Sequence, residues 1–541
     1  MKPLPRAKWY IALPCAIVGG LLLDLAAPDV AWWPAAILGV LLVLASVWQQ
    51  HAGRALGYGA VAGAAFWMPH IKWLTLYLGP VPWLGLCSVM IVWFALFGLL
   101  SGLATRGLGM LRAPRTLIAL LQALVIAGLW VAREQVQSSW PYGGFDWGRV
   151  AHAQVGGPFS ALAAWVGIAG LSGLVVFGCA LLLGGVLTVR ALRARILVGG
   201  MVAALCTTLA FVPVYPLEPS GNLRVAAVQG NSKSGIFDDR ENGDVFRSHV
   251  EATEELLERL DRTGDSVDVI VWPENSAEFQ IPEQVFRVQT LRALSARANA
   301  PIVVGSVLQD PDGTYTNSSL VFDAQGDTGA RYDKRRPVPF AEYMPHRAFF
   351  HALAPDLVDL VQLEYAFGQR PTVLPINTST TQVLAGIAIC FDVVFDDHAV
   401  AMAKDGAELI LAQTNNADFG RTDESAQQLQ IARLRAIEMG RALVNVSTVG
   451  ISALALPDGT LTHELPPFTP TSFVADVPLY EDLTPALRFG GVIAGAFITI
   501  GVTGAVIGTI MLRETRRARP QTESRRAAHR AGTLHGATGP N

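Results

Sequence analysis

Charged residues are scarce in this chain. Asp, Glu, Lys and Arg make up 16% of its 541 residues, whereas about 25% is usual in soluble domains. Hydrophobic residues make up 51%, and the mean hydropathy is +0.37. This deficit of charge excludes an ordinary soluble protein and predicts a membrane protein. A basic patch interleaved with aromatic residues is also missing, so we predict no nucleic-acid partner.

Cysteine is scarce as well, with five residues in the chain. Four of them lie in long apolar segments, which excludes a framework of disulfides: Cys15, Cys87, Cys179 and Cys206. The fifth, Cys390, ends a run that is typical of a buried strand, Leu384–Cys390. No spacing of His, Cys, Asp or Glu resembles a metal site, so we predict neither a metal nor a cofactor.

Long apolar runs stand where a soluble protein would carry charge. A helix needs about 20 apolar residues to cross a bilayer. We count eight candidate runs, at residues 9–25, 31–48, 55–68, 81–105, 116–132, 159–189, 196–213 and 489–512. The sixth is long enough to tilt or to contain a break. Residues 1–213 are therefore predicted to hold seven membrane helices, and residues 489–512 an eighth.

Basic residues between these runs set the expected orientation, because short cytoplasmic loops are enriched in Lys and Arg. Alternate loops hold 14 of them: Lys2, Arg6, Lys8, Arg54, Arg106, Arg112, Arg115, Arg190, Arg193, Arg195, Arg513, Arg516, Arg517 and Arg519. The opposite short loops hold Lys72, Arg133 and Arg149 beside several acidic residues. Both termini are thus predicted to be cytoplasmic, and residues 214–488 to lie on the outer side.

The segment 214–488 has a different pattern, in which short β-like runs alternate with amphipathic helical ones. Expected strands are 224–228, 267–272, 302–307, 319–323, 383–389, 409–414, 443–447 and 451–456. Expected helices are 245–262, 283–299, 396–405 and 424–439. The alternation predicts a layered α/β domain with its own core. Residues 513–541, rich in Arg, Ala, Gly and Thr, are expected to form a basic, disordered cytoplasmic tail.

Three residues with reactive side chains stand at or just after strands or strand-like runs in this domain. They are Glu274, Lys334 and Cys390. Glu274 directly follows Pro273, the residue at which the strand is expected to end. A thiol beside a base and a cation can act as a nucleophile whose oxyanion the cation stabilises. Taken singly, each residue has a plainer interpretation. Glu274 could be a solvated acid, Lys334 part of a solvated cationic loop, and Cys390 a core thiol.

A long segment from Pro337 to about Gln369 has little regular pattern but many apolar side chains, among them Phe340 and Met344. Long irregular loops in compact domains are often functional lids. This loop could therefore admit acyl chains from a bilayer. The alternative is a packed excursion without such a role.

The chemistry-bearing motifs resemble those of a known superfamily. Val271–Glu274, Tyr332–Lys334 and Ile389–Asp392 resemble the Glu, Lys and Cys motifs of the nitrilase, or carbon–nitrogen hydrolase, superfamily. Within it, the chain resembles the apolipoprotein N-acyltransferase family, which the layout of seven apolar runs, an outer domain and a closing run also matches. Four further segments resemble that family: Val228–Asn231, Pro337–Glu342, Thr414–Gly420 and Gln430–Glu438. The resemblance covers nearly the whole chain except the tail.

The resemblance implies a nitrilase-like αββα sandwich beside a membrane bundle of about eight helices. It also implies that Cys390 is the nucleophile, Glu274 the general base and Lys334 the oxyanion stabiliser. Supporting and substrate-binding positions are expected at Glu342, Phe391, Asp392, Asn415, Phe419, Phe340 and Met344. Two positions depart from the family pattern. Phe391-Asp392 stands where the family often has Tyr-Glu, and Asp418 where it often has Trp.

The activity that the resemblance implies is an acyl transfer in the bacterial plasma (inner) membrane. A fatty acyl chain would pass from a phospholipid, through a thioester on Cys390, to the α-amino group of a lipoprotein's S-diacylglyceryl-cysteine. We expect a monomer. One alternative is a membrane-tethered amidase that uses the same three residues. A transporter with an accessory outer domain is disfavoured, because transporters place charged residues inside their spans and these runs have almost none.

Overall fold

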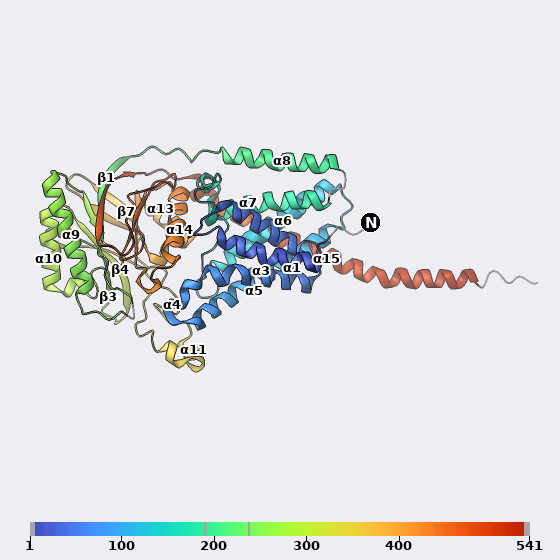
Figure 1. The fold of residues 1–541 in the computed structure, drawn as a ribbon, viewed down its shortest axis with the longest axis horizontal. Coiled ribbons are helices and arrows are strands. Elements are labelled where there is room, and N and C mark those ends of the chain that lie inside the picture. The colour runs from blue at the N-terminus through green and yellow to red at the C-terminus, as the bar shows by residue number, and fades with distance from the viewer. Residues whose placement is uncertain (1–5, 189–191, 236–237, 535–541) are drawn as a thin grey trace, which may run out of the picture.

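The computed structural model of the protein describes residues 6–188, 192–235 and 238–534. Helices gather in a bundle at one end of the molecule, and strands with their covering helices form the other end (Figure 1). Lys2 and Arg190, two of the residues that set the expected orientation, lie outside the described ranges. The fold therefore combines the apolar helices and the α/β layers that the sequence predicts.

Each of the eight apolar runs falls on a helix of the bundle. These helices are α1 (Trp9–Leu25), α2 (Trp33–Val47), α3 (Ala52–His70), α5 (Pro80–Leu108), α6 (Arg115–Gln137), α7 (Ala163–Thr188), α8 (Leu192–Ala210) and α15 (Pro485–Leu534). Among the described residues, four stretches are long and apolar enough to cross a membrane: Pro80–Leu108, Arg115–Gln137, Ser160–Leu187 and Pro485–Thr515. Three shorter helices are apolar as well: Trp9–Leu25, Trp33–Val47 and Arg195–Ala210. The chain is thus a membrane protein by the length and composition of its helices.

The bundle differs from the sequence prediction at two points, in α6 and in the tail. Arg133 was assigned to a loop, but α6 continues to Gln137, and the buried Arg133 pairs with Glu134 at 3.1 Å. Of the two alternatives for the long sixth run, tilt or break, the structure has a break, because Gly167 has a non-helical backbone within α7. The segment from Arg513, expected to be disordered, is instead helical as far as Leu534. It extends an apolar helix that is already formed, so no new helix has to be nucleated, and its Arg and Ala residues favour the helix.

Two six-stranded sheets form the other end of the molecule. The first has the order β12-β1-β2-β3-β4-β5, and the second β11-β10-β9-β8-β7-β6. The strands of the first are β1 (Gly221–Gln229), β2 (Val269–Val271), β3 (Ile302–Gln309), β4 (Tyr315–Asp323), β5 (Gly326–Asp333) and β12 (Thr471–Leu479). Those of the second are β6 (Val373–Asn377), β7 (Gln382–Ile389), β8 (Leu409–Thr414), β9 (Leu443–Ser447), β10 (Ala453–Ala455) and β11 (Leu461–Thr462). The central strands β1, β2 and β3 run parallel, as do β7, β8 and β9.

The two sheets face each other across an apolar core, and helices cover their outer faces. Valine, leucine and isoleucine side chains from both sheets share this core. On the first sheet, α9 (Asp244–Thr263) and α10 (Val285–Ala298) form the cover, with a second apolar cluster beneath them. On the second sheet, α13 (Asp396–Lys404) and α14 (Glu424–Met439) form the cover. The four layers are those of an αββα sandwich, and all eight strands and four helices predicted here are present.

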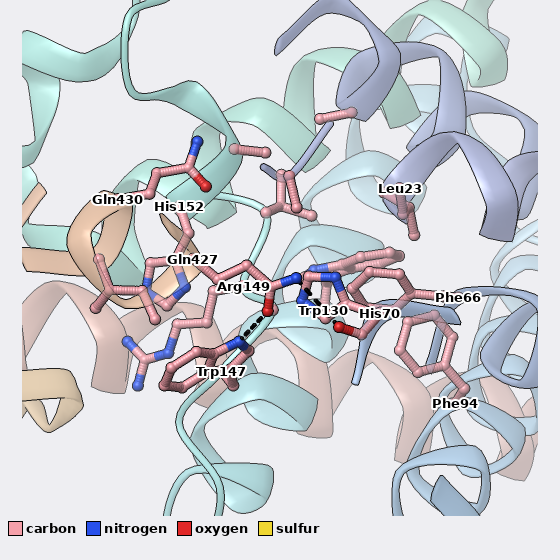
Figure 2. Close-up of a pocket in the computed structure, with 16 residues that line it drawn as sticks. Leu23, Phe66, His70, Phe94, Trp130, Trp147, Arg149, His152, Gln427 and Gln430 are labelled. Carbon is pink, nitrogen blue, oxygen red and sulfur yellow. Dashed lines mark hydrogen bonds between the residues drawn. The ribbon is translucent and has the colours of Figure 1, made fainter. Parts of the chain in front are cut away.

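Helix α14 lies between the second sheet and the bundle, so its side chains are buried on almost every face (Figure 1). Gln427 secures this position. Its side-chain oxygen accepts hydrogen bonds from the indoles of Trp73, at 3.2 Å, and Trp147, at 2.7 Å. Its amide nitrogen donates to the carbonyl of His70 at 3.1 Å (Figure 2). The rotation of α14 is thereby fixed, which matters for the residue that follows Gln427.

Candidate active site

Glu274 stands at the carboxyl end of the buried strand β2. Pro273 before it cannot donate a hydrogen bond to a neighbouring strand, so the chain leaves the sheet here. Gly305 on β3 allows the close approach, because a Cβ at that position would lie 2.6 Å from the carbonyl oxygen of Pro273. The Glu274 side chain is 4% exposed. A carboxylate is thus delivered from the sheet into a largely water-free pocket.

Lys334 follows β5 and is buried between two carboxylates. Its Nζ lies 3.2 Å from Oε1 of Glu274 and 2.9 Å from Oε2 of Glu342. Asn317 on β4 donates from Nδ2 to both carboxylates, at 2.7 Å to Glu274 and 3.0 Å to Glu342. A backbone N–H, that of Val338, fixes the second oxygen of Glu342 at 2.7 Å. The ammonium is therefore held in one place, which an oxyanion stabiliser requires.

Cys390 begins the short 3₁₀ turn η5 (Cys390–Val394), directly after β7. Its φ of 48° lies in the left-handed region, where a residue with a side chain is strained. This sharp turn from strand to helix presents the sulfur at the strand end. The residue as a whole is partly exposed, unlike Cys87 and Cys179 in the bundle. Its strained backbone and its place at the end of a strand do not fit an ordinary core cysteine.

The three groups act on one another electrostatically. Burial raises the pKa of the Cys390 thiol well above its usual range, and the Glu274 charge raises it further, whereas Lys334 opposes the shift. Burial also raises the pKa of Glu274, against the effect of Lys334. Burial alone would lower the pKa of Lys334, but Glu274 and Glu342 hold it well above its usual range. The structure thus places the Cys390 thiol within electrostatic reach of both Glu274 and Lys334, which contact each other, and burial favours the neutral form of the thiol.

Asp392 supports the turn that carries the thiol. It is fully buried, and its Oδ2 accepts the backbone N–H of Ile389 at 3.2 Å and the hydroxyl of Tyr332 at 2.6 Å. Its other oxygen accepts the backbone N–H of Arg336 at 2.9 Å. Asp392 therefore ties the Cys390 turn to the segments on either side of Lys334. The shorter carboxylate at this position still reaches its partners.

The remaining predicted residues lie around the pocket or outside it. Phe391 is buried at the contact with the bundle, where its ring stacks on Phe145 at 6.2 Å between centroids. Phe419 packs edge-on against Trp73 at 4.9 Å. Asn415 exchanges hydrogen bonds with Ser234, so its side chain holds a neighbouring loop. Met344 and Phe340 belong to a separate small apolar cluster within the loop 337–369, together with Val358, Val361 and Phe350.

Three polar residues of the site were not identified from the sequence. They are Asn317, Asn416 and Gln428, all nearly fully buried. Asn317 bridges the two carboxylates, and Gln428 donates from Nε2 to the Cys390 sulfur at 3.5 Å. The sequence carries only a weak indication of these residues. A polar residue inside a strand, or consecutive glutamines on a helix with a buried face, indicates an internal hydrogen-bond network. It does not indicate that the network belongs to an active site.

Two family models match most of the chain. The Apolipoprotein N-acyltransferase N-terminal domain matches residues 19–181, and the Carbon-nitrogen hydrolase domain matches residues 224–481. The second contains all three pocket residues and the two sheets.

Curated relatives extend over nearly the whole chain. An apolipoprotein N-acyltransferase of Mycolicibacterium smegmatis is 32% identical, with 92% of this chain and 85% of the relative covered. One of Azotobacter vinelandii is 28% identical, with 95% and 97% covered. Because two family models cover the helical bundle and the sandwich, and one relative is 32% identical over 92% of the chain, the chain belongs to the apolipoprotein N-acyltransferase family.

Proposed function

We propose that this protein transfers a fatty acyl chain from a membrane phospholipid to the α-amino group of a diacylated lipoprotein. The observation that carries the proposal is the buried Glu274–Lys334 pair, whose two members shift the pKa of the Cys390 thiol in opposite directions. Membership of the acyltransferase family supports acyl transfer over the amidase alternative. The apolar bundle beside the pocket gives a physical reason for lipid substrates on both sides of the reaction.

The proposed reaction has two steps through a thioester. Glu274 accepts the thiol proton while the sulfur attacks the ester carbonyl carbon, and the negative oxygen forms beside Lys334. The bond from carbon to the glycerol oxygen then breaks, and this oxygen takes the proton from Glu274 as the lysophospholipid leaves. In the second step the lipoprotein amine attacks the thioester, Glu274 accepts the amine proton, and the thiol is restored. Glu342 and Asn317 keep the ammonium and the base in place throughout.

We also propose a topology, on the strength of the basic loops and the eight apolar helices. Residues 1–213 would form seven membrane helices, 214–488 the catalytic domain, 489–512 the eighth helix, and 513–541 a basic tail. Both termini would be cytoplasmic, and the domain would lie on the outer face of the bacterial plasma membrane. The segment from Pro337 to about Gln369 would form a lid, and the protein would act as a monomer.

Covalent labelling tests the proposal. Purified protein in vesicles is incubated with phospholipid that carries a labelled acyl chain, and the Cys390 peptide is analysed by mass spectrometry. We expect an acyl adduct on the wild type and none on Cys390→Ala. Cys87→Ala, which removes a buried bundle thiol, should label like the wild type. Adding a diacylated lipopeptide should discharge the adduct onto its amine. Equal labelling of wild type and Cys390→Ala would overturn the thioester, and discharge to water alone would favour the amidase.

A further inference from the structure

Gln428 on α14 touches the sulfur of Cys390. Its Nε2 lies 3.5 Å from Sγ, a normal length for an N–H donor and a sulfur acceptor. The side chain is 2% exposed, so water cannot replace this hydrogen bond. Gln427, one position earlier, points to the bundle and fixes the rotation of the helix. Successive helical positions are about 100° apart, so this rotation directs Gln428 to the other side, toward the sheet end.

The amide of Gln428 is oriented by a second buried amide. Its Oε1 accepts a hydrogen bond from Nδ2 of Asn416 at 3.0 Å. The oxygen of Asn416 is itself fixed, because it accepts from the hydroxyl of Ser447 at 2.6 Å. Nδ2 of Asn416 also donates to Oε2 of Glu424 at 2.7 Å. Hydroxyl, amide and carboxyl partners together leave one orientation for Gln428, with its N–H groups directed to the sulfur.

We propose that Gln428 is a further catalytic residue, whose N–H stabilises the Cys390 thiolate as Glu274 removes the proton, and that Asn416 and Glu424 position it. This inference rests on the proposed role of Cys390 as nucleophile. In the first step, the S–H bond breaks and the electron pair left on sulfur is held by the Gln428 donor until the carbon–sulfur bond forms. In the second step, the same donor holds the departing thiolate. A hydrogen bond to a charged partner is about twice as strong as one to a neutral partner, so it favours the ionised sulfur.

Three charged or titratable groups act on this sulfur, together with the Gln428 hydrogen bond. Glu274, at the end of β2, raises the pKa of the thiol, whereas Lys334, after β5, and the Gln428 hydrogen bond lower it. Glu424, at the start of α14, raises it when ionised. Burial raises the pKa of Glu424 itself to about 8. Glu424 is therefore mostly neutral near pH 7, where it can accept from Asn416 without repelling the thiolate.

The test is the alkylation rate of Cys390 by iodoacetamide between pH 7 and 9, followed on the Cys390 peptide by mass spectrometry. The rate measures the thiolate fraction without any lipid substrate. Gln428→Met keeps the shape and removes the donor, and we expect alkylation about tenfold slower at each pH, equivalent to a thiol pKa about one unit higher. Gln428→Glu, a second variant of the same size, should slow it further. Gln430→Met, the same change two positions along the helix, should leave the rate unchanged.

A rate for folded Gln428→Met within twofold of the wild type, or an equal fall in Gln430→Met, would overturn the inference. Thermal midpoints of all variants check folding. In the acyl-transfer assay, Gln428→Met should lower kcat and leave the lipopeptide KM unchanged. If wild type fails to form an acyl adduct while alkylation still depends on Gln428, the hydrogen bond stands and the proposed function fails. If the acyl adduct forms but the alkylation rate of Cys390 is the same in wild type and Gln428→Met, only this inference fails.

Discussion

Two clusters of buried charge can be compared in this molecule. The pocket cluster consists of Glu274 and Lys334, at the ends of β2 and β5, and Glu342 in the loop after β5. The seam cluster consists of Arg149, Asp396, Arg435 and Glu438, where α13 and α14 meet the bundle. In the seam, Asp396 accepts from Arg149 at 2.9 Å and from Arg435 at 3.1 Å. Arg435 also donates to the carbonyls of Val393 and Val394, at 3.2 and 2.7 Å, and pairs with Glu438.

The difference lies in what each cluster surrounds. The seam charges satisfy one another and the carbonyls at the end of the Cys390 turn, so they fix the domain to the bundle without adjoining a reactive group. The pocket charges are also paired, but they converge on a neutral thiol at a strained backbone position. Buried ion pairs therefore do not by themselves mark a catalytic site. What distinguishes the pocket cluster is a titratable thiol beside it, whose pKa Glu274 raises and Lys334 lowers.

The largest expected effect comes from changing the pocket cluster. Glu274→Gln and Lys334→Met should each lower acyl transfer by about 10³-fold or more, which is about 4 kcal/mol of transition-state stabilisation. The base is lost in one variant and the oxyanion partner in the other. Initial rates with a fluorescent lipopeptide acceptor measure the effect.

Arg335→Met is the matched control for Lys334→Met. The Arg335 side chain donates to the carbonyl of Arg370 at 3.0 Å. Among the described residues, the side chains that bond to the Glu274 and Glu342 carboxylates are those of Lys334 and Asn317. We expect its rate to stay within a few-fold of the wild type. A comparable loss in Arg335→Met would mean that the whole basic loop, rather than one ammonium, carries the effect.

A smaller effect, on stability rather than on chemistry, is expected from the seam cluster. Asp396→Asn removes the charge shared by two buried arginines, whose side chains are 1% and 0% exposed. Because a third of the Asp396 side chain is exposed, we expect a loss of about 2 kcal/mol, less than for a fully buried pair. Thermal unfolding in detergent measures it as a lower midpoint. Asp397→Asn, at the more exposed neighbour, is the control. An unchanged midpoint in Asp396→Asn would contradict the assigned role of the seam.

The smallest effect concerns Glu424, which lies beside the pocket but outside both clusters. Its folded pKa of about 8 is above the ordinary value of 4.5, so the stability it contributes is full below pH 4.5 and is lost as the pH rises through 8. Between pH 7 and 9 the wild type should lose about 1.4 kcal/mol from this group. Glu424→Gln does not titrate and should keep that stability. Urea midpoints at the two pH values measure the difference, and parallel losses in both proteins would exclude Glu424 as the source.

The strands that carry Glu274 and Cys390 were predictable, because buried apolar runs lead to both. Four strands were missed: β11, which has two residues, and β5, β6 and β12, which were missed for identifiable reasons. β5 reads Gly-Asp-Thr-Gly-Ala-Arg-Tyr-Asp, with glycine and charge where a strand pattern has apolar residues. β6 and β12 each contain a proline, Pro375 and Pro478, which argues against a central strand. All three are edge strands, where exposed charge and a missing donor are tolerated.

The sequence by itself determined that apolar helices accompany an α/β sandwich and that an acid, a lysine and a thiol stand at or just after its strand ends. The spacing of apolar residues along a strand or helix indicates which of its faces is buried, so these features could be derived without coordinates. Only the tertiary structure decided that Asn317 joins the two carboxylates, that Gln428 reaches the sulfur, and that the seam charges pair. Hydrogen bonds depend on distances within a few tenths of an ångström and on the rotation of a helix against its neighbours, and residue spacing carries neither.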